Sequence, residues 1–590
     1  MKQFFKFLLA VILGGIVTVF LIFLILFGMI AGIATFAGSG EKQVSISENT
    51  ILHMDLNTSV VERTTEDPFT EAMATMQDSP SPLGLNNILK NIKKAKEDDN
   101  IKGIYLETGM INAGFATIEE IRNALIDFKK SEKFIISFSP IYTQKSYYLA
   151  SVSDNIYLNP GGMLEFKGLA SQNVFLRGTL EKLGVEMQIV KHGKFKSAVE
   201  PFIRDNMSEP ARLQTKKYVN SIWEHVVKKI GEERNLSRAE LMAIADKMIT
   251  YGDVQGFVDA GLIDALKYKD EVLDKLKGLT DTKLKDDLTS ISIRKYTNVV
   301  VPGSAKGFVK DKIAIIYAEG AIDGTSRDGI DSEKLSKAIR KARRDSSIKA
   351  IVFRVNSPGG SALGSEIIWR EVKLTQEVKP VVVSMGDLAA SGGYYISCAA
   401  NTIVAHANTL TGSIGVFGLI PNTEGLMKKI GITFDGVKTN KFADMPTFSR
   451  RFTKEERTLM QSSVEFIYKT FITRCADGRE TTNAKIDEIG QGRVWSGEDA
   501  LNINLVDTIG GVNLAIDIAK QKAGLEKYRI VELPKIPNPF EKFMKEMTGN
   551  VKMFIGKSIM GDEYKYLQTI ENLKSGYQIQ ARIPYNVEVY

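Results

Sequence analysis

The chain is poor in the residues that build metal centres and disulfide frameworks. It has 2 cysteines and 4 histidines among 590 residues, which excludes a disulfide-dense scaffold and a four-cysteine zinc site. We therefore expect no metal and no cofactor. Charge of one sign is also scarce, because 77 basic and 70 acidic side chains leave a net charge of +7. An excess this dilute does not indicate a nucleic-acid partner.

One long apolar run is present near the N-terminus. Residues 7–37 carry no charged side chain, and Lys2 and Lys6 precede them. A bilayer span needs about 20 apolar residues, whereas the apolar region of a cleaved signal peptide has about 7–15. We therefore predict an uncleaved transmembrane helix that meets the lipid bilayer through residues 7–37, with a cleaved signal ending near Ala37 as the alternative. Because positive charge stays cytoplasmic, the rest of the chain is expected outside.

The chain matches itself when it is shifted by 247 positions. Tyr147-Tyr148 then meets Tyr394-Tyr395, Gly168 meets Gly415, and later the shift falls to 243. A period this long indicates two copies of one domain rather than a solenoid repeat. We predict four segments: an anchor region 1–40, a first repeat 47–305, a second repeat 306–533 and a tail 534–590. The tail is interpreted either as a membrane-surface helix or as a segment that packs on a neighbouring subunit.

Each copy alternates apolar runs with helical patterns. In the second copy, residues 313–317, 350–353 and 380–384 are typical of buried strands, and residues 333–344 and 362–374 have helical periodicity. This alternation predicts an α/β fold with a mostly parallel sheet and helices packed outside it.

A serine and two glycine-rich turns could carry chemistry. Ser391 comes where a strand gives way to a helix, and free backbone N–H groups at a helix start favour developing negative charge. Pro358-Gly359-Gly360 follows another strand and leaves N–H groups near an incoming carbonyl. Together they are typical of a nucleophile with an oxyanion hole, although separately they would be a helix cap and a plain turn.

A nucleophilic serine needs a base, and the residue types leave two options. His406 and His192 could each complete a triad with a serine. A lysine could also act, provided that burial lowers its pKa by several units from about 10.4. The residues alone do not choose between these options.

Three stretches resemble the signal peptide peptidase A family. They are 387–395 around Ser391, the turn 356–360, and 193–202 around Lys196. The resemblance is to the long, duplicated, membrane-anchored form and implies tandem ClpP/crotonase-like domains. It also implies a serine–lysine dyad, with Ser391 as nucleophile, Lys196 as general base and Ser413 orienting the lysine amine. The implied oxyanion-hole residues are Gly359, Gly360 and Gly392.

The repeat adds a separate argument about the two halves of the dyad. Shifting Ser391 back by 247 gives Gln144, and shifting Lys196 forward gives Ala443. The first copy also lacks the Pro-Gly-Gly turn, and Thr108-Gly109-Met110-Ile111-Asn112 stands in its place. We therefore expect the first repeat to supply the base and the second to supply the nucleophile.

The resemblance implies a serine endopeptidase of the bacterial inner membrane, single-pass, with its catalytic domains on the outer side. The implied substrates are remnant signal peptides and other hydrophobic peptides, and the implied assembly is a homotetramer. A crotonase-type acyl-CoA enzyme and a catalytically inactive membrane scaffold are the alternatives.

Overall fold

The computed structural model describes residues 45–64, 81–300, 309–324 and 329–536, the short strand β20 (Gln580–Arg582) and a few isolated positions before residue 22. The predicted span 7–37 and the predicted tail 534–590 lie almost wholly outside the described residues. Within the described part of the chain, no helix combines the length and apolar character needed to cross a bilayer.

The first repeat is built around a six-stranded parallel sheet with the order β8-β6-β5-β4-β1-β9. Its strands are β1 (Thr50–Asp55), β4 (Ile101–Glu107), β5 (Phe134–Tyr142), β6 (Asn155–Leu164), β8 (Ala265–Leu266) and β9 (Ser290–Ser292). A separate two-stranded ladder joins β2 (Val60–Val61) to β3 (Leu83–Gly84). Apolar clusters lie on both faces of the main sheet, as a buried parallel sheet requires.

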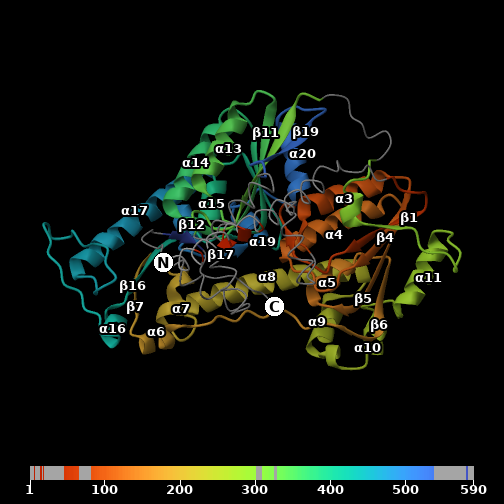
Figure 1. Cartoon of the computed structure of the whole chain (residues 1–590), viewed down its shortest axis with the longest axis horizontal. Coiled ribbons are helices and arrows are strands. Elements are labelled where there is room, and N and C mark those ends of the chain that lie inside the picture. The colour runs from red at the N-terminus through yellow and green to blue at the C-terminus, as the bar shows by residue number, and fades with distance from the viewer. Residues whose placement is uncertain are drawn as a thin grey trace.

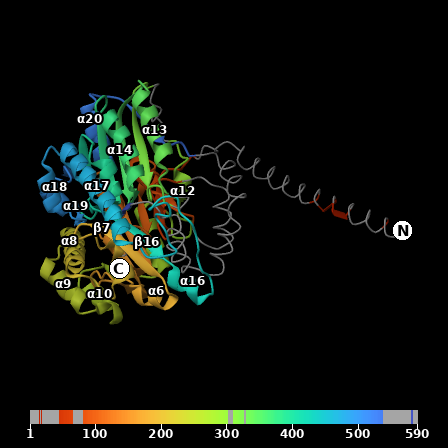
Figure 2. The same ribbon diagram turned by 90° about the vertical axis from the view of Figure 1, so that its left-hand side faces the viewer.

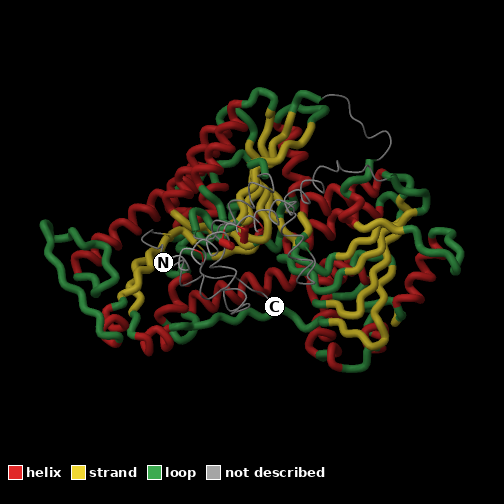
Figure 3. Tube along the Cα trace, viewed as in Figure 1, coloured by secondary structure: helices red, strands yellow, loops and turns green. Residues whose placement is uncertain are grey.

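The second repeat has an eight-stranded sheet whose main path is β17-β15-β13-β11-β10-β19, with β14 and β18 branching from β13. Its strands are β10 (Lys312–Glu319), β11 (Ile348–Ser357), β13 (Val381–Ala390), β14 (Thr402–Ala405), β15 (Leu410–Gly412), β17 (Val494–Ser496), β18 (Thr508–Ile509) and β19 (Arg529–Leu533). Two of the three predicted strands fall inside β10 and β11, and the third, 380–384, overlaps β13 in all but its first residue. Figure 3 shows the strands of this sheet and those of the first as two separate groups.

Helices repeat with the strands, which confirms the duplication. The first-repeat helices are α3 (Leu85–Glu97), α4 (Phe115–Lys129), α5 (Gln144–Ala150), α6 (Arg177–Leu183), α7 (Glu200–Ile203), α8 (Glu209–Arg234), α9 (Arg238–Asp246), α10 (Gln255–Asp259), α11 (Lys269–Leu279) and α12 (Ile293–Tyr296). Those of the second are α13 (Ser332–Arg344), α14 (Ala362–Gln376), α15 (Gly392–Ser397), α16 (Glu424–Lys429), α17 (Lys454–Gly478), α18 (Asn483–Ile489), α19 (Gly497–Asn502) and α20 (Val512–Lys522). A shift of 247 carries α3 onto α13 and α4 onto α14, and a shift of 243 carries α11 onto α20.

A third sheet joins the two repeats. Its order is β12-β20-β16-β7, where β7 (Glu186–His192) comes from the first repeat and β12 (Gly359–Ser361) and β16 (Val416–Asn422) come from the second. β7 and β16 run antiparallel, with His192 opposite Val416. Figure 2 shows the two strands side by side beneath α17. In Figure 1, α8 runs from this region back toward the helices of the first repeat.

Candidate active site

Ser391 lies at the turn between β13 and α15. It is completely buried, and its backbone has φ +56° and ψ −116°, an unusual conformation for a residue with a side chain. Its N–H donates to Gly412 O (2.8 Å), and its carbonyl accepts from Tyr395 N (2.9 Å) as α15 begins. Strain of this kind persists only where the surrounding structure holds it in place.

The pairing of β7 with β16 explains how Lys196 reaches Ser391. Because the strands are antiparallel, the end of β7 lies beside the start of β16. Lys196 follows β7 by four residues and Ser413 precedes β16 by three. Lys196 Nζ lies 2.8 Å from Ser391 Oγ, 3.1 Å from Ser413 Oγ and 3.1 Å from Ser413 O. The structure thus brings the three predicted side chains together, one from the first repeat and two from the second.

Burial lowers the pKa of Lys196 to about 7. Its side chain is 1% exposed, and no carboxylate among the described residues acts on its pKa. A neutral amine fits the three contacts: its two N–H groups can donate to Ser413 O and Ser413 Oγ, which leaves the lone pair for the Ser391 hydroxyl.

Two glycines make room for the lysine side chain. A Cβ on Gly492, which has φ +79°, would lie 2.6 Å from Lys196 Cβ, and one on Gly415 would lie 3.2 Å from Lys196 Cδ. The same loop braces Ser413, whose N–H donates to Arg493 O (2.7 Å) and whose hydroxyl lies 3.4 Å from Gly492 O. Any side chain at position 492 would therefore displace the lysine.

The three predicted oxyanion glycines occupy different situations. Gly392 opens α15, where the first N–H groups of a helix have no intrahelical partner. Gly359 donates its N–H to Ser357 Oγ (3.2 Å), so that group is engaged within its own turn. Gly360 pairs with Ala581 of β20. Their role in oxyanion binding stays a prediction.

The two candidate histidines lie elsewhere. His192 stacks on Tyr468, with ring centroids 3.7 Å apart, and its Nδ1 lies 2.6 Å from Glu465 Oε2. His406 is buried between Glu119 and Glu120 of the first repeat. Among the described residues, Ser391 Oγ has hydrogen-bond contacts with Lys196 Nζ and Gly415 O, so the geometry favours the lysine option.

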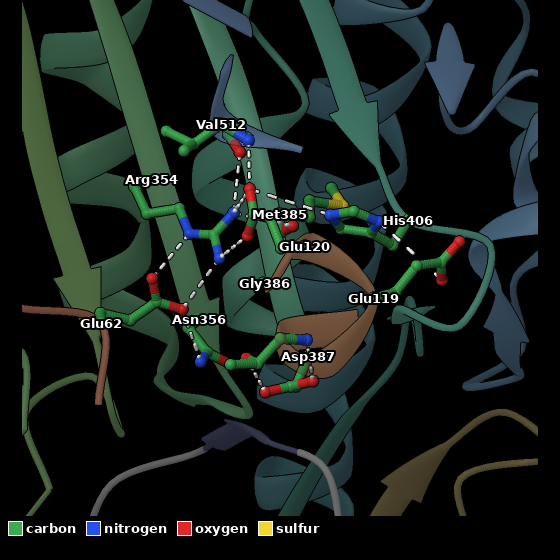
Figure 4. A network of polar contacts seen from close by, with 12 residues as sticks. Glu62, Glu119, Glu120, Arg354, Asn356, Met385, Gly386, Asp387, His406 and Val512 are labelled. Carbon is green, nitrogen blue, oxygen red and sulfur yellow. Dashed lines mark hydrogen bonds and ion pairs between the residues drawn. The ribbon is translucent and has the colours of Figure 1, made fainter. Parts of the chain in front are cut away.

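A buried ionic network joins the two repeats (Figure 4). Arg354, in the middle of β11, donates Nε to Glu62 Oε2 (2.8 Å) and Nη2 to Glu120 Oε2 (2.8 Å). All three side chains are at most 5% exposed. Burial raises the pKa of Glu62, whereas Arg354 and His406 more than offset the effect of burial on Glu120 and hold its pKa at about 2.

The sequence contained a signal for this network that we did not use. Arg354 is a charged residue inside an otherwise apolar buried strand, and such a residue needs buried acidic partners. Another undetected residue is Gln214 of α8, which is buried. Its amide donates to Phe195 O and Ser197 Oγ (both 3.0 Å), on either side of Lys196, and accepts from Val494 N (3.1 Å). A lone glutamine in a helix carries no such signal.

A strained, buried serine at a strand-to-helix turn, contacted by a buried lysine amine whose pKa is lowered, in an α/β fold, is the arrangement of a serine hydrolase. Comparison with known proteins gives the family. Residues 127–283 and 373–526 both match Peptidase family S49, so the chain belongs to that family and is a serine peptidase with a duplicated family region.

Two relatives extend the match over most of the chain. "Protease 4" of Salmonella typhi is 36% identical over 560 residues, which cover 92% of this chain and 89% of the relative. "Serine protease SPPA, chloroplastic" of Arabidopsis thaliana is 34% identical over 512 residues, 85% and 74% of the two chains. A ClpP1 structure from Listeria monocytogenes aligns with 34% of this chain and 94% of its own, at 14% identity and a TM-score of 0.24. At that score the ClpP-like assignment stays a prediction.

Proposed function

We propose that the protein is a membrane-anchored serine endopeptidase in which Ser391 is the nucleophile and Lys196 the general base. The observation that carries the proposal is the 2.8 Å contact between Lys196 Nζ and Ser391 Oγ, made by an amine whose pKa burial lowers to about 7. A base with a pKa near the operating pH is unprotonated in about half of the molecules and still accepts a proton in the transition state.

The reaction follows from these contacts. Neutral Lys196 takes the Ser391 hydroxyl proton as Oγ attacks the peptide carbonyl carbon, and N–H groups of the glycine turns hold the oxyanion. The C–N bond then breaks, and the lysine ammonium gives its proton to the leaving amine. Water attacks the acyl-enzyme, Lys196 takes a proton from it, and that proton returns to Ser391 Oγ as the acid leaves. Ser413 accepts a hydrogen bond from the amine and keeps its lone pair on Ser391.

The position of β20 supports an extended peptide as substrate. This strand of the chain's own C-terminal region pairs antiparallel with β12, which carries Gly359 and Gly360, and contacts β16 through Phe417. Strand addition is a common way to bind a peptide, since main-chain hydrogen bonds tolerate many sequences. An acyl-CoA ligand would not use such a backbone ladder, which weighs against the crotonase-type alternative.

The membrane setting is part of the proposal. Residues 7–37 would anchor the chain in the bacterial inner membrane, with tandem ClpP/crotonase-like domains on the outer side acting on signal-peptide remnants and other hydrophobic peptides. A homotetramer is supported by exposed apolar side chains in the segment that follows α16, among them Phe434 and the fully exposed Val437.

The test uses the full-length chain in detergent micelles, assayed for fluorophosphonate labelling and for cleavage of a signal peptide. Ser391→Ala and Lys196→Met should each lower kcat/KM by about 10³-fold or more, while Lys194→Met, which removes an exposed lysine two residues away, should not. Activity that survives Lys196→Met would refute the lysine base. Absence of labelling in the wild type would favour the inactive scaffold, and acyl-CoA turnover without labelling the crotonase-type enzyme.

A further inference from the structure

The strand that carries Ser391 is interrupted by a bulge just before the serine. Along β11 and β13, Val355 pairs with Met385, but the next pair is Ser357 with Ala389. β13 therefore advances four residues while β11 advances two. Before the bulge β13 pairs with β14, and after it β13 pairs with β15, where Ala390 lies opposite Gly412. The bulge thus turns the end of β13 toward the segment that contains Ser413.

The first repeat holds the bulge through Asp387. The Asp387 carboxylate accepts from Thr117 N (2.9 Å) and from the Thr117 hydroxyl (2.5 Å) at the start of α4. Gly114, the N-cap residue of α4, has no side chain to cap the helix, and a Cβ there would lie 2.1 Å from the Asp387 carboxylate. Asp387 of the second repeat therefore supplies the cap that α4 of the first repeat lacks.

A second hydrogen-bonded connection runs through Asn356, the first residue of the turn 356–360 that carries the predicted oxyanion glycines. Its side-chain carbonyl accepts from Leu388 N (3.1 Å), inside the bulge, and its amide donates to Glu62 Oε1 (2.9 Å) of the first repeat. A Cβ on Gly386 would lie 2.7 Å from Glu62 Oε1 and 2.9 Å from Asn356 Cγ. Figure 4 shows Glu62, Asn356, Gly386 and Asp387 gathered on this side of the network. The bulge is thus packed and hydrogen-bonded from both of its sides.

The corresponding position of the first repeat has no such connection. Shifting Asp387 back by 247 gives Pro140, which is exposed and carries no carboxylate. In the second repeat the equivalent helix α14 is capped by its own Ser361, which accepts from Gly364 N (3.1 Å). The carboxylate at 387 therefore has no counterpart in the repeat that lacks the serine.

We propose that the 386–388 bulge aims the Ser391 hydroxyl at Lys196, and that Asp387 and Asn356 are positioning residues which the first repeat holds in place. This inference rests on the proposed function, because it assigns these residues to the geometry of the same serine and lysine. The first repeat then contributes twice to catalysis: it supplies the base, and it fixes the strand that presents the nucleophile. Bulges beside active sites commonly re-aim a side chain in this way.

The experiment compares Asp387→Ala, Asp387→Asn and Thr117→Val in the full-length chain. A misplacement of about 1 Å costs about 100-fold in rate, so Asp387→Ala should lower kcat by about that factor with little change in KM. Asp387→Asn keeps an acceptor for Thr117 N and should lose about tenfold. Thr117→Val removes only the hydroxyl donor and should lose several-fold. The rate of fluorophosphonate labelling should fall in the same order. The pH at which kcat/KM begins to fall on the acid side should equal that of wild type, because Lys196 remains buried.

Asn86→Ala is the matched control, since it removes another hydrogen bond between the repeats, from Asn86 Nδ2 to Glu532 Oε1 (3.1 Å), without touching the bulge. Melting temperatures accompany every rate. Wild-type kcat in the two Asp387 variants overturns the inference, as does a loss that Asn86→Ala reproduces at equal melting temperature. If Asp387→Ala does not fold, an unchanged kcat in Thr117→Val overturns it. Ser391→Ala is assayed in parallel, and activity in that variant would refute the proposed function instead.

Discussion

The two repeats share one frame and differ at the turn after the third strand of their parallel sheets. In the second repeat Ser391 holds φ +56° before α15. In the first, α5 is capped by Thr143 with φ −68°, and its side chain accepts from Ser146 N (3.2 Å). The same strand, turn and helix therefore adopt a relaxed cap where no chemistry is expected. The strained backbone is specific to the repeat that carries the serine.

The place of the site is filled in the first repeat. Gln144, the counterpart of Ser391, accepts from Lys167 N (3.0 Å) and Gly168 N (2.9 Å) and donates to Gly168 O (3.0 Å). Phe166, the counterpart of Ser413, is buried in the apolar core. Gly168 is the counterpart of Gly415, which lies beside Lys196 in the second repeat. The duplication therefore leaves one copy with a serine and a lysine in contact and one copy in which a glutamine and a phenylalanine fill the same place.

Adding a methyl group at Gly492 would fill space that the Lys196 side chain occupies in the second repeat. Gly492→Ala places a Cβ 2.6 Å from Lys196 Cβ at a positive φ. We expect the amine to move off Ser391, with kcat/KM lower by about 100-fold or more. The control is Gly256→Ala in the first repeat, which has open space around the added Cβ. Steady-state peptide hydrolysis measures both, and equal activities would contradict this account of the lysine's position.

The pH dependence tests which repeat supplies the base. With a Lys196 pKa of about 7, the amine is charged below that pH. We expect kcat/KM to fall about tenfold for each pH unit below 7 and to level off above it. A pH profile of kcat/KM for wild type and for His406→Gln distinguishes Lys196 from His406 as the base. If Lys196 is the base, the fall in kcat/KM at low pH should be the same in both proteins. A fall that moves or disappears in His406→Gln would restore the histidine as base.

The sequence predicted the repeat and three strands of the second copy, because buried strands are continuous apolar runs. The three side chains that meet at the site were predicted from the family resemblance, and the duplication supported two of them by exposing Gln144 and Ala443 as the lost halves of the dyad. The sequence did not predict that β7 pairs with β16, or that Gln580–Arg582 joins the same sheet. These paired strands are separated by more than 150 residues. The pattern of apolar and polar residues within a short strand does not indicate which other strand it will pair with.

Placing a serine and a lysine at the corresponding positions of the first repeat should not create a second active site. Gln144→Ser leaves Lys167 N and both polar groups of Gly168 without their side-chain partner, and each lost hydrogen bond costs about 1 kcal/mol. The lysine counterpart, Ala443, lies exposed in a loop. In a Ser391→Ala background, Gln144→Ser with Ala443→Lys should therefore lower the melting temperature and give no fluorophosphonate labelling. Labelling of that combined variant would show that the two repeats differ by side chains alone.

The smallest expected effect concerns His406, which lies where the two repeats meet. His406 is buried, and in the described part of the chain neither ring nitrogen has a hydrogen-bond partner. Its Nδ1 lies 3.9 Å from Glu119 Oε2 and its Nε2 lies 3.8 Å from Glu120 Oε1. Burial alone would lower the His406 pKa, and Arg354 acts in the same direction, but the two carboxylates outweigh both and raise it. The imidazolium is thus the form that suits its surroundings.

A raised pKa means that the folded state holds this proton more tightly than the unfolded chain does. The stabilisation is then complete below the unfolded pKa of about 6.5 and is lost as the pH rises through the folded value. We expect wild type to melt at a higher temperature than His406→Gln, and we expect this difference in melting temperature to be larger at pH 5.5 than at pH 9. The difference should change by about 2–4 °C or less between the two pH values. Differential scanning calorimetry at both pH values measures this. A difference that stays constant would mean that His406 is neutral, and that Arg354 alone balances the buried carboxylates where the repeats meet.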